Sequence, residues 1–237
     1  MINNVLSSIY SRSTLFNPRQ KKKLSRGGVV FEKLYLSSKP RVVFLLKDPG
    51  VSGGWSWPEE MRKQIRNVKT KDSFSLGWHK TARQLGIWSY GICNDFPDYD
   101  KIENNTNSAE GLKYVGMSNL KKTPGTSNVS TMSQVEQEAR RTSKLLKQEL
   151  DIMAPDIIIC CGRNCMGDLV TNVLGFPNTK LHIQASGQKF QYSVIQTKRR
   201  NVIIIDFYHP ANQDKKQALM YQDLKKVFNG LKRRSLI

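Results

Sequence analysis

The sequence predicts an α/β protein, a three-layer α/β/α sandwich around a central four-stranded, mainly parallel sheet. Three apolar runs, over residues 41–46, 156–161 and 202–207, lack polar alternation, which is typical of strands buried on both faces of a parallel sheet. Helical patterns lie between these runs, and strands that alternate with helices favour a parallel sheet. The 237 residues suffice for one domain with a substantial core, which we expect over residues 29–237.

Residues 1–28 are rich in Ser, Asn and Lys and include three consecutive lysines, Lys21, Lys22 and Lys23. This composition is typical of a basic N-terminal arm, which is either mobile on a phosphate backbone or a plain solvated terminus. The sequence leaves both interpretations open. Residues 29–36 favour a short edge element.

The remaining elements follow from periodicity, caps and breakers. A capping-box pattern over residues 133–136 predicts a helix start, and Pro155 predicts the end of that helix. Gly86 is expected to end an earlier helix, and the Asn-rich segment 95–110 is expected to be a loop. The predicted strands are 41–46, 114–120, 156–161 and 202–207, with a hairpin over 181–197; the predicted helices are 58–68, 76–85, 133–152, a helix from Gly162 to Leu174, and 213–233.

The composition points to a polyanionic partner. Lys and Arg number 38 against 19 Asp and Glu, which gives a net charge of +19. Such a surplus favours binding to nucleic acid or an anionic membrane, and the plain alternative is a solvated basic surface. No apolar run approaches 18 residues, so no membrane span is expected, and the N-terminus lacks the pattern of a secretory signal.

The cysteine pattern indicates a reducing compartment and no metal. The four cysteines, Cys93, Cys160, Cys161 and Cys165, form no C-x-x-C pair, and two of them lie inside an apolar run. We therefore expect a cytoplasmic protein without a disulfide framework. A metal or iron–sulfur site is disfavoured because the spacing fits no common ligand pattern.

Three predicted strands have polar side chains at their carboxyl ends, namely Asp48, Asn119 and His209. Open α/β sheets bind ligands at this edge, so a carboxylate, an amide and an imidazole are expected to converge there. Each residue taken alone is explained equally well as a turn former, since Asp and Asn favour turns and Pro follows both Asp48 and His209. Three such residues at equivalent positions favour a site.

The motifs that carry these residues resemble those of the uracil-DNA glycosylase superfamily over roughly residues 40–230. Residues 47–50, Lys-Asp-Pro-Gly, are similar to the water-activating turn of that family. Residues 118–122, Ser-Asn-Leu-Lys-Lys, resemble its base-reading strand end, and residues 208–211, Tyr-His-Pro-Ala, resemble its closing His-Pro-Ser motif. Residues 156–162 are similar to the penultimate strand and the glycine after it.

The resemblance implies a role for each matching residue. Asp48 would position or deprotonate the water that attacks C1′ of the sugar, and His209 would hydrogen-bond the base oxygen O2 as negative charge develops. Asn119 would bind the Watson–Crick edge of a flipped pyrimidine. Phe74 would stack on that base, although a core role for this ring is an equally good interpretation. The enzyme would be monofunctional, would need no cofactor or metal, and would act as a monomer.

The departures from the family concern DNA contacts and the base pocket. Ala211 replaces the serine that grips a phosphate, so Ser52, Asn212 or Lys215 is expected to substitute, and Lys121 and Lys122 are expected to contact the backbone of single- or double-stranded DNA. No bulky residue follows Ala211 to intercalate.

By the resemblance, Gly50 stands where a Tyr in the uracil-only branch blocks C5 substituents, and Gly53 and Gly54 are close by in sequence. This difference suggests a pocket for C5-modified pyrimidines, compatible with the branch that excises glucosylated hydroxymethylcytosine from phage DNA. Alternatively, the glycines only permit a tight turn.

Three other functions remain open at this point. A plain uracil repair glycosylase would have the same three strand ends. A non-catalytic nucleic-acid-binding protein would share the fold and the charge. A nucleotide-binding α/β enzyme is less favoured, because no Lys-Ser/Thr follows the glycines and no G-x-G-x-x-G occurs.

Overall fold

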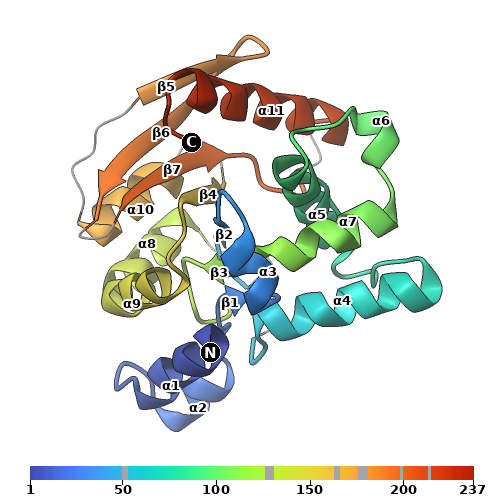
Figure 1. Cartoon of the computed structure of the whole chain (residues 1–237). Coiled ribbons are helices and arrows are strands. Elements are labelled where there is room, and N and C mark those ends of the chain that lie inside the picture. Colours follow the sequence, from blue (N-terminus) through green and yellow to red (C-terminus); the bar gives the residue numbers. More distant parts are fainter. Residues whose placement is uncertain (50–52, 126–130, 163–165, 176–180, 198–199, 213–214) are drawn as a thin grey trace.

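A mixed β-sheet of seven strands runs through the middle of the molecule in the order β1-β3-β2-β4-β7-β6-β5 (Figure 1). The computed structural model describes residues 1–237 except 50–52, 126–130, 163–165, 176–180, 198–199 and 213–214. The strands are β1 Gly28–Val29, β2 Val42–Leu46, β3 Val115–Asn119, β4 Ile157–Cys161, β5 Leu181–Ala185, β6 Gln188–Gln196 and β7 Asn201–Phe207. The helices are α1 Ile2–Arg12, α2 Pro18–Lys22, α3 Glu32–Ser37, α4 Trp57–Lys71, α5 His79–Cys93, α6 Tyr99–Ile102, α7 Asn105–Gly111, α8 Met132–Arg141, α9 Ser143–Met153, α10 Met166–Leu174 and α11 Gln217–Arg233, with the 3-10 turn η1 Leu112–Tyr114.

The four predicted strands form the parallel centre of this sheet, as β3, β2, β4 and β7. The expected sheet of four strands is too small, because β1 pairs antiparallel with β3 and the predicted hairpin, β5 and β6, pairs antiparallel with β7. Strand β1 is only two residues long, too short to give a pattern in the sequence. The hairpin was expected, but a local pattern does not reveal which strand it extends.

Helices cover both faces of the sheet, and the residues of each central strand alternate between them. Val42, Phe44 and Leu46 face a core that also contains apolar side chains of α4, α5 and α11. Val43 and Leu45 face the other core, with side chains of α1, α8, α9 and α10. The sheet is therefore the middle of three layers, as Figure 1 shows.

The N-terminal segment is folded onto the domain, which corrects the expectation of a mobile basic arm. Leu6, Tyr10, Phe16 and Leu24 are each at most 4% exposed. The hydroxyl of Tyr10 donates a hydrogen bond to Glu149 of α9. The prediction was wrong because these apolar residues are spaced along α1 and the following turns, diluted among polar neighbours.

Four local expectations were also wrong. Segment 95–110 contains α6 and α7 rather than a loop, and the helix expected over 133–152 is divided into α8 and α9 at Thr142. Its capping box is formed by Thr131 and Gln134, two residues before the predicted one. Gly86 lies inside α5 and does not end it: a Cβ there would lie 2.1 Å from the carbonyl oxygen of Ser108, so this glycine permits close packing against α7.

Within the residues described, no helix combines the length and the apolar character that a bilayer crossing requires.

Candidate site at the carboxyl ends of the parallel strands

The last residues of the four parallel strands stand in one row across the sheet. Asn119 of β3 pairs with Leu46 of β2, which pairs with Cys161 of β4, which pairs with Phe207 of β7. Asp48 and His209 each lie two residues beyond this row, while Asn119 is part of it. The connections after β2 and β4 lead to opposite sides, so this edge contains the topological switch point where α/β sheets bind ligands. We call Asp48, Asn119 and His209 the carboxyl-end site.

The turns after β2 and β3 are joined by backbone hydrogen bonds beyond the strands. The N–H of Leu120 donates to the carbonyl of Leu46 (2.8 Å), and the N–H of Lys121 donates to the carbonyl of Lys47 (3.0 Å). These bonds hold the residue before Asp48 directly beside the chain that follows Asn119. Asp48 is half-buried in this arrangement.

His209 lies in a tight turn that fixes its tautomer. The N–H of Ala211 donates to Nδ1 of His209 (3.2 Å), and the N–H of Asn212 donates to its carbonyl oxygen (3.0 Å). A ring nitrogen that accepts a hydrogen bond carries no proton, so the hydrogen of the neutral ring is on Nε2. The ring reaches solvent, yet the surrounding protein lowers the pKa of His209 below its ordinary value of 6.5, against the opposing effect of Asp48.

Two of the predicted catalytic residues lie within electrostatic range of each other. Asp48 raises the pKa of His209, and its negative charge likewise acts on Lys121. The carboxylate therefore lies within electrostatic range of groups on β3 and β7, on both sides of its own strand.

Asn119 is completely buried at the end of β3. Its Nδ2 donates to Oγ of Ser25 (2.8 Å), and its Oδ1 has no hydrogen-bond partner. An unpaired buried amide oxygen costs free energy, so this position suits a group that pairs with a ligand. Ser25 itself was not predicted as a site residue, and its place beside Asn119 depends on a backbone bond from its N–H to the carbonyl of Lys122 (2.9 Å).

Lys121 and Lys122 were both predicted to contact phosphate, and for Lys122 this prediction is wrong. Its side chain is fully buried, forms an ion pair with Glu149 and donates to Oγ of Ser118 (2.6 Å). Lys121 is only 7% exposed, and its ammonium donates to the carbonyl of Thr123 (2.7 Å). Burial lowers the pKa of Lys121, while Asp48 and Glu138 act in the opposite direction.

Lys215, another predicted phosphate ligand, supports the His209 turn from inside. Its ammonium donates to the carboxylate of Asp223 on α11 (2.6 Å) and to the hydroxyl of Tyr208 (2.6 Å). Tyr208 in turn donates to Asp223 (3.0 Å). These bonds anchor the residue just before His209 to α11. Asn212 is half-buried in the same turn, and Ser52 lies outside the described residues.

The glycine hypothesis is corrected at Gly53. A Cβ on Gly53 would lie 2.1 Å from the carbonyl oxygen of Lys23 and 3.1 Å from Cδ of Pro124. The space beside this residue is therefore filled by protein, and the glycine permits a close backbone approach instead of opening a pocket wall. Gly50 lies outside the described residues.

Phe74 is 4% exposed and belongs to the core on the α4 and α5 face. Its ring stands edge to face with His79, with centroids 6.4 Å apart. Phe74 is therefore a core residue. Its stacking on an extruded base stays a prediction. No sequence pattern indicated the cluster of three tryptophans, Trp55, Trp57 and Trp78, whose rings contact one another edge-on with centroids 4.8–5.2 Å apart.

Two hollows of the described surface lie elsewhere. One of about 870 Å³ includes Arg41, Asp156 and Asn201, and another of about 850 Å³ includes Pro155 and Val202. Both are at the amino ends of the parallel strands, where side chains such as Arg41 and Asp156 are already paired with each other. Among the described residues, no group of three or more His, Cys, Asp or Glu side chains could hold a metal ion.

The fold and the carboxyl-end site define an α/β protein with polar groups gathered at the switch point of a parallel sheet. In sequence, the chain matches no known protein-family model and no curated protein.

Proposed function

We propose that this protein is a DNA glycosylase that hydrolyses the N-glycosidic bond of a pyrimidine extruded from DNA and leaves an abasic site. The observation that carries this proposal is the position of Asp48, Asn119 and His209 at the carboxyl ends of β2, β3 and β7, three of the four parallel strands, with Asp48 within electrostatic range of His209. This arrangement is what the resemblance to the uracil-DNA glycosylase superfamily requires.

The chemistry of the three groups fits the reaction. Cleavage builds positive charge on the sugar and negative charge on the departing base. A carboxylate at Asp48 stabilises the sugar cation and orients the attacking water. A neutral His209 with its hydrogen on Nε2 donates to the base oxygen as that oxygen becomes negative, without a competing charge of its own.

Asn119 supplies recognition of the extruded base. The amide has one half bonded to Ser25 and the other half without a partner, so it can hydrogen-bond the edge of a pyrimidine. Because an amide can present either its donor or its acceptor, this residue accommodates uracil or cytosine. The net charge of +19 supports DNA as the polymer that carries the base.

Tolerance of C5 substituents now depends on Gly50 alone, since the space beside Gly53 is filled. A panel of substrates decides this point. Single-stranded and duplex oligonucleotides containing uracil, 5-hydroxymethyluracil or glucosylated hydroxymethylcytosine are incubated with the protein and then treated with alkali. We expect cleavage only after the alkaline step, as for a monofunctional enzyme. Activity on plain uracil alone would remove the C5 hypothesis.

Two substitutions test the proposed catalytic roles. Asp48→Asn and His209→Ala are each expected to lower the rate of abasic-site formation by about 10²-fold or more, while DNA affinity persists. His182→Ala is a matched control, because His182 is exposed on β5, at the far edge of the sheet. If the wild-type protein forms no abasic sites on any substrate but binds DNA, the non-catalytic nucleic-acid-binding alternative replaces this proposal.

A further inference from the structure

A polar hollow lies between α1 and α4, beside β1 at the edge of the sheet (Figure 1). Its volume is about 450 Å³, which is within the usual range for a small-molecule site. Its walls carry two guanidinium groups, an aromatic ring, an amide and a hydroxyl, from Arg26, Arg62, Phe31, Asn4 and Ser7. None of these side chains belongs to the carboxyl-end site, so the hollow is a candidate for a second site.

Both arginines have donor groups that the protein does not use. On Arg62, Nε donates to the carbonyl of Val30 (2.8 Å), and the guanidinium stands over the ring of Phe31, 5.8 Å from its centroid. Arg26 contacts Glu59 at 3.7 Å, and because both side chains are exposed this pair adds little stability. A guanidinium carries five N–H donors, so most of those on Arg26 and Arg62 have no hydrogen-bond partner among the described residues.

Two carboxylates line the same hollow without blocking an anion. Glu32 already accepts hydrogen bonds from the amino group of Met1 and the N–H of Asn3, so its charge is balanced within the protein. The side chain of Glu59 is exposed and can turn into solvent when an anion binds Arg26. The two guanidinium groups therefore determine the sign of the charge that the hollow attracts.

A short backbone segment separates the hollow from Asn119. The N–H of Arg26 donates to the carbonyl of Trp55 (3.1 Å), and the N–H of Trp57 donates to the carbonyl of Arg26 (3.0 Å). The preceding residue, Ser25, accepts a hydrogen bond from Nδ2 of Asn119 (2.8 Å). Consecutive side chains of an extended segment point to opposite sides, so Ser25 faces the carboxyl-end site while Arg26 lines the hollow. The hollow and the carboxyl-end site are therefore neighbours.

We propose that this hollow is a nucleotide-binding subsite, in which Arg26 and Arg62 bind the phosphate and Phe31 packs against the base; its use during excision rests on the proposed glycosylase function. Two guanidinium groups suit a phosphate, because their N–H donors match its oxygens and they stay charged. The ring of Phe31, which is 37% exposed, suits a base, because every base has a face that stacks on an aromatic ring. Asn4 and Ser7 are exposed and can hydrogen-bond the polar edge of that base.

The first experiment titrates the protein with deoxyadenosine monophosphate, deoxyadenosine and inorganic phosphate in a calorimeter. We expect the nucleotide to bind with a Kd of about 1 mM or below, and the other two probes to bind at least about tenfold more weakly, because each makes only part of the contacts. A nucleotide that does not saturate the protein in this range, or that binds no better than inorganic phosphate, would overturn the proposal.

Substitutions then assign the contacts. Arg26→Gln and Arg62→Gln are each expected to weaken nucleotide binding by about tenfold or more, since each loses charge-assisted hydrogen bonds. Phe31→Ala should weaken it by about fivefold or more through lost stacking. Arg233→Gln is the matched control, because it removes the same charge from an exposed position on α11, which packs against β5 at the opposite edge of the sheet from β1. Glu59→Gln should tighten binding, a gain that damage to the fold cannot produce.

An equal loss in the Arg233→Gln control would show a general effect of charge and would overturn the subsite. Competition identifies the source of the nucleotide. If the occupant belongs to the DNA strand, deoxyadenosine monophosphate lowers the affinity of the Asp48→Asn protein for an oligonucleotide with the target base, and Phe31→Ala removes this competition. If the occupant is a free nucleotide, it leaves the DNA affinity unchanged or raises it.

None of these readouts depends on excision. A wild-type protein that makes no abasic sites would defeat the glycosylase proposal and leave the subsite to the calorimetry. Failure of the calorimetry would remove the subsite and leave the glycosylase proposal intact.

Discussion

At the scale of single residues, the protonation of His209 links the geometry of the site to pH. Its Nδ1 accepts a hydrogen bond from the N–H of Ala211, so the ring is neutral in this structure. If Nδ1 were protonated, its N–H would face the N–H of Ala211, and the turn would have to rearrange. Burial lowers the pKa of His209, which keeps this rearrangement away from neutral pH.

The first prediction follows from that pKa. A group with a lowered pKa in the folded protein is protonated only as pH falls below its ordinary value, here 6.5. We expect the single-turnover excision rate to be level above pH 6.5 and to decline below it. In His209→Gln, which keeps a neutral donor, this decline should move to lower pH. A decline that is unchanged in His209→Gln would assign the titration to another group.

At the scale of elements, a buried ion pair fastens the N-terminal helix to the sheet. Lys122 follows β3, Glu149 lies in α9, and Tyr10 of α1 donates to the same carboxylate, with both charged side chains at 0% exposure. The N–H of Gly27 also donates to Glu149 (2.9 Å). One charged pair therefore joins three elements and the segment before β1.

The second prediction concerns this pair. Lys122→Met leaves the charge of Glu149 buried without its partner and is expected to lower the free energy of unfolding by about 3 kcal/mol or more, measured by urea denaturation at pH 7. Replacing both residues by methionine should recover part of the loss. Lys101→Met is the control, because its exposed pair with Asp98 contributes at most about 1 kcal/mol. A loss of similar size in both single variants would contradict the assignment.

The third prediction contrasts two glycines. Gly53→Ala is expected to destabilise the protein by about 2 kcal/mol or more, since the new Cβ would collide with the carbonyl oxygen of Lys23. Because Gly53 lies in the segment that follows Asp48, this variant should also lower the excision rate. Gly77→Ala should change stability by less than about 0.5 kcal/mol, because a Cβ there meets no described atom within 4 Å. Thermal unfolding of the two variants measures the difference, and equal effects would show that Gly53 tolerates a side chain.

These elements also show what the sequence could reveal. Strands β2, β4 and β7 were predictable because each lies in a nearly continuous apolar run, and Asp48 and His209 were predictable from their position just after two of these runs. The close backbone approach at Gly53 was not predictable, because it depends on Lys23, a residue 30 positions earlier. The prediction that Lys122 contacts phosphate was wrong for the same reason. A lysine in a basic turn is expected to be exposed to solvent, and its burial is explained only by Glu149, which is distant in sequence.

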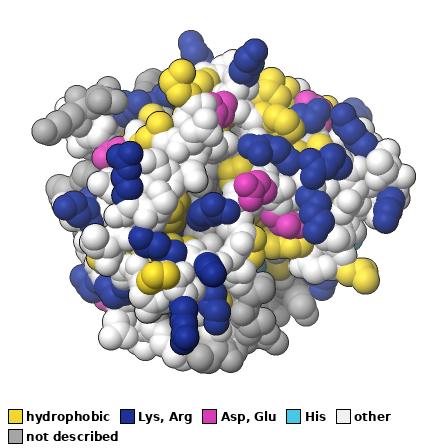
Figure 2. Space-filling view, turned by 90° about the horizontal axis from the view of Figure 1, so that it is seen from below, with side chains coloured by type: hydrophobic (Ala, Val, Ile, Leu, Met, Phe, Trp, Pro, Cys, Tyr) yellow, Lys and Arg dark blue, Asp and Glu magenta, His cyan; other side chains and the backbone are white. Residues whose placement is uncertain are grey.

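At the scale of the whole molecule, positive charge is spread over the surface. Figure 2 views the molecule from the side of α1 and α2 and shows Lys and Arg side chains over much of that face, with far fewer acidic ones. With Lys122 buried, the proposed binding of DNA phosphates requires exposed lysines elsewhere. Lys22 and Lys23 are exposed, and their carbonyl oxygens touch Gly54 and Gly53 in the segment after Asp48. The backbone of the N-terminal lysines therefore lies beside the segment that follows Asp48.

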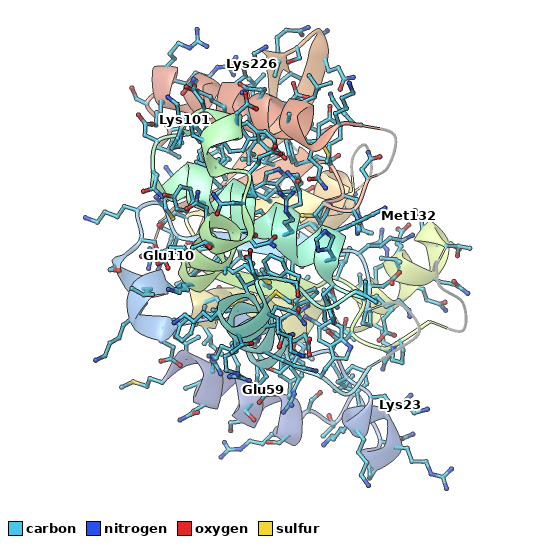
Figure 3. All side chains as sticks on the ribbon, turned by 90° about the vertical axis from the view of Figure 1, so that its right-hand side faces the viewer. Lys23, Glu59, Lys101, Glu110, Met132 and Lys226 are labelled. Carbon is cyan, nitrogen blue, oxygen red and sulfur yellow. The ribbon has the colours of Figure 1, made fainter. Side chains whose placement is uncertain are left out.

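The fourth prediction tests whether DNA lies along this side. Every lysine that binds a phosphate releases counterions, so removing one such lysine reduces the steepness of the dependence of log affinity on log salt by about one. Lys22→Ala with Lys23→Ala should weaken duplex binding and reduce that slope by about two. Lys101→Ala with Lys226→Ala is the matched control, since Figure 3 places both of these lysines at the opposite end of the molecule from Lys23. Because both double variants remove the same net charge, a general decrease in charge would change the two slopes equally. Only a local DNA-binding surface beside Asp48 would make the Lys22 and Lys23 variant differ from its control.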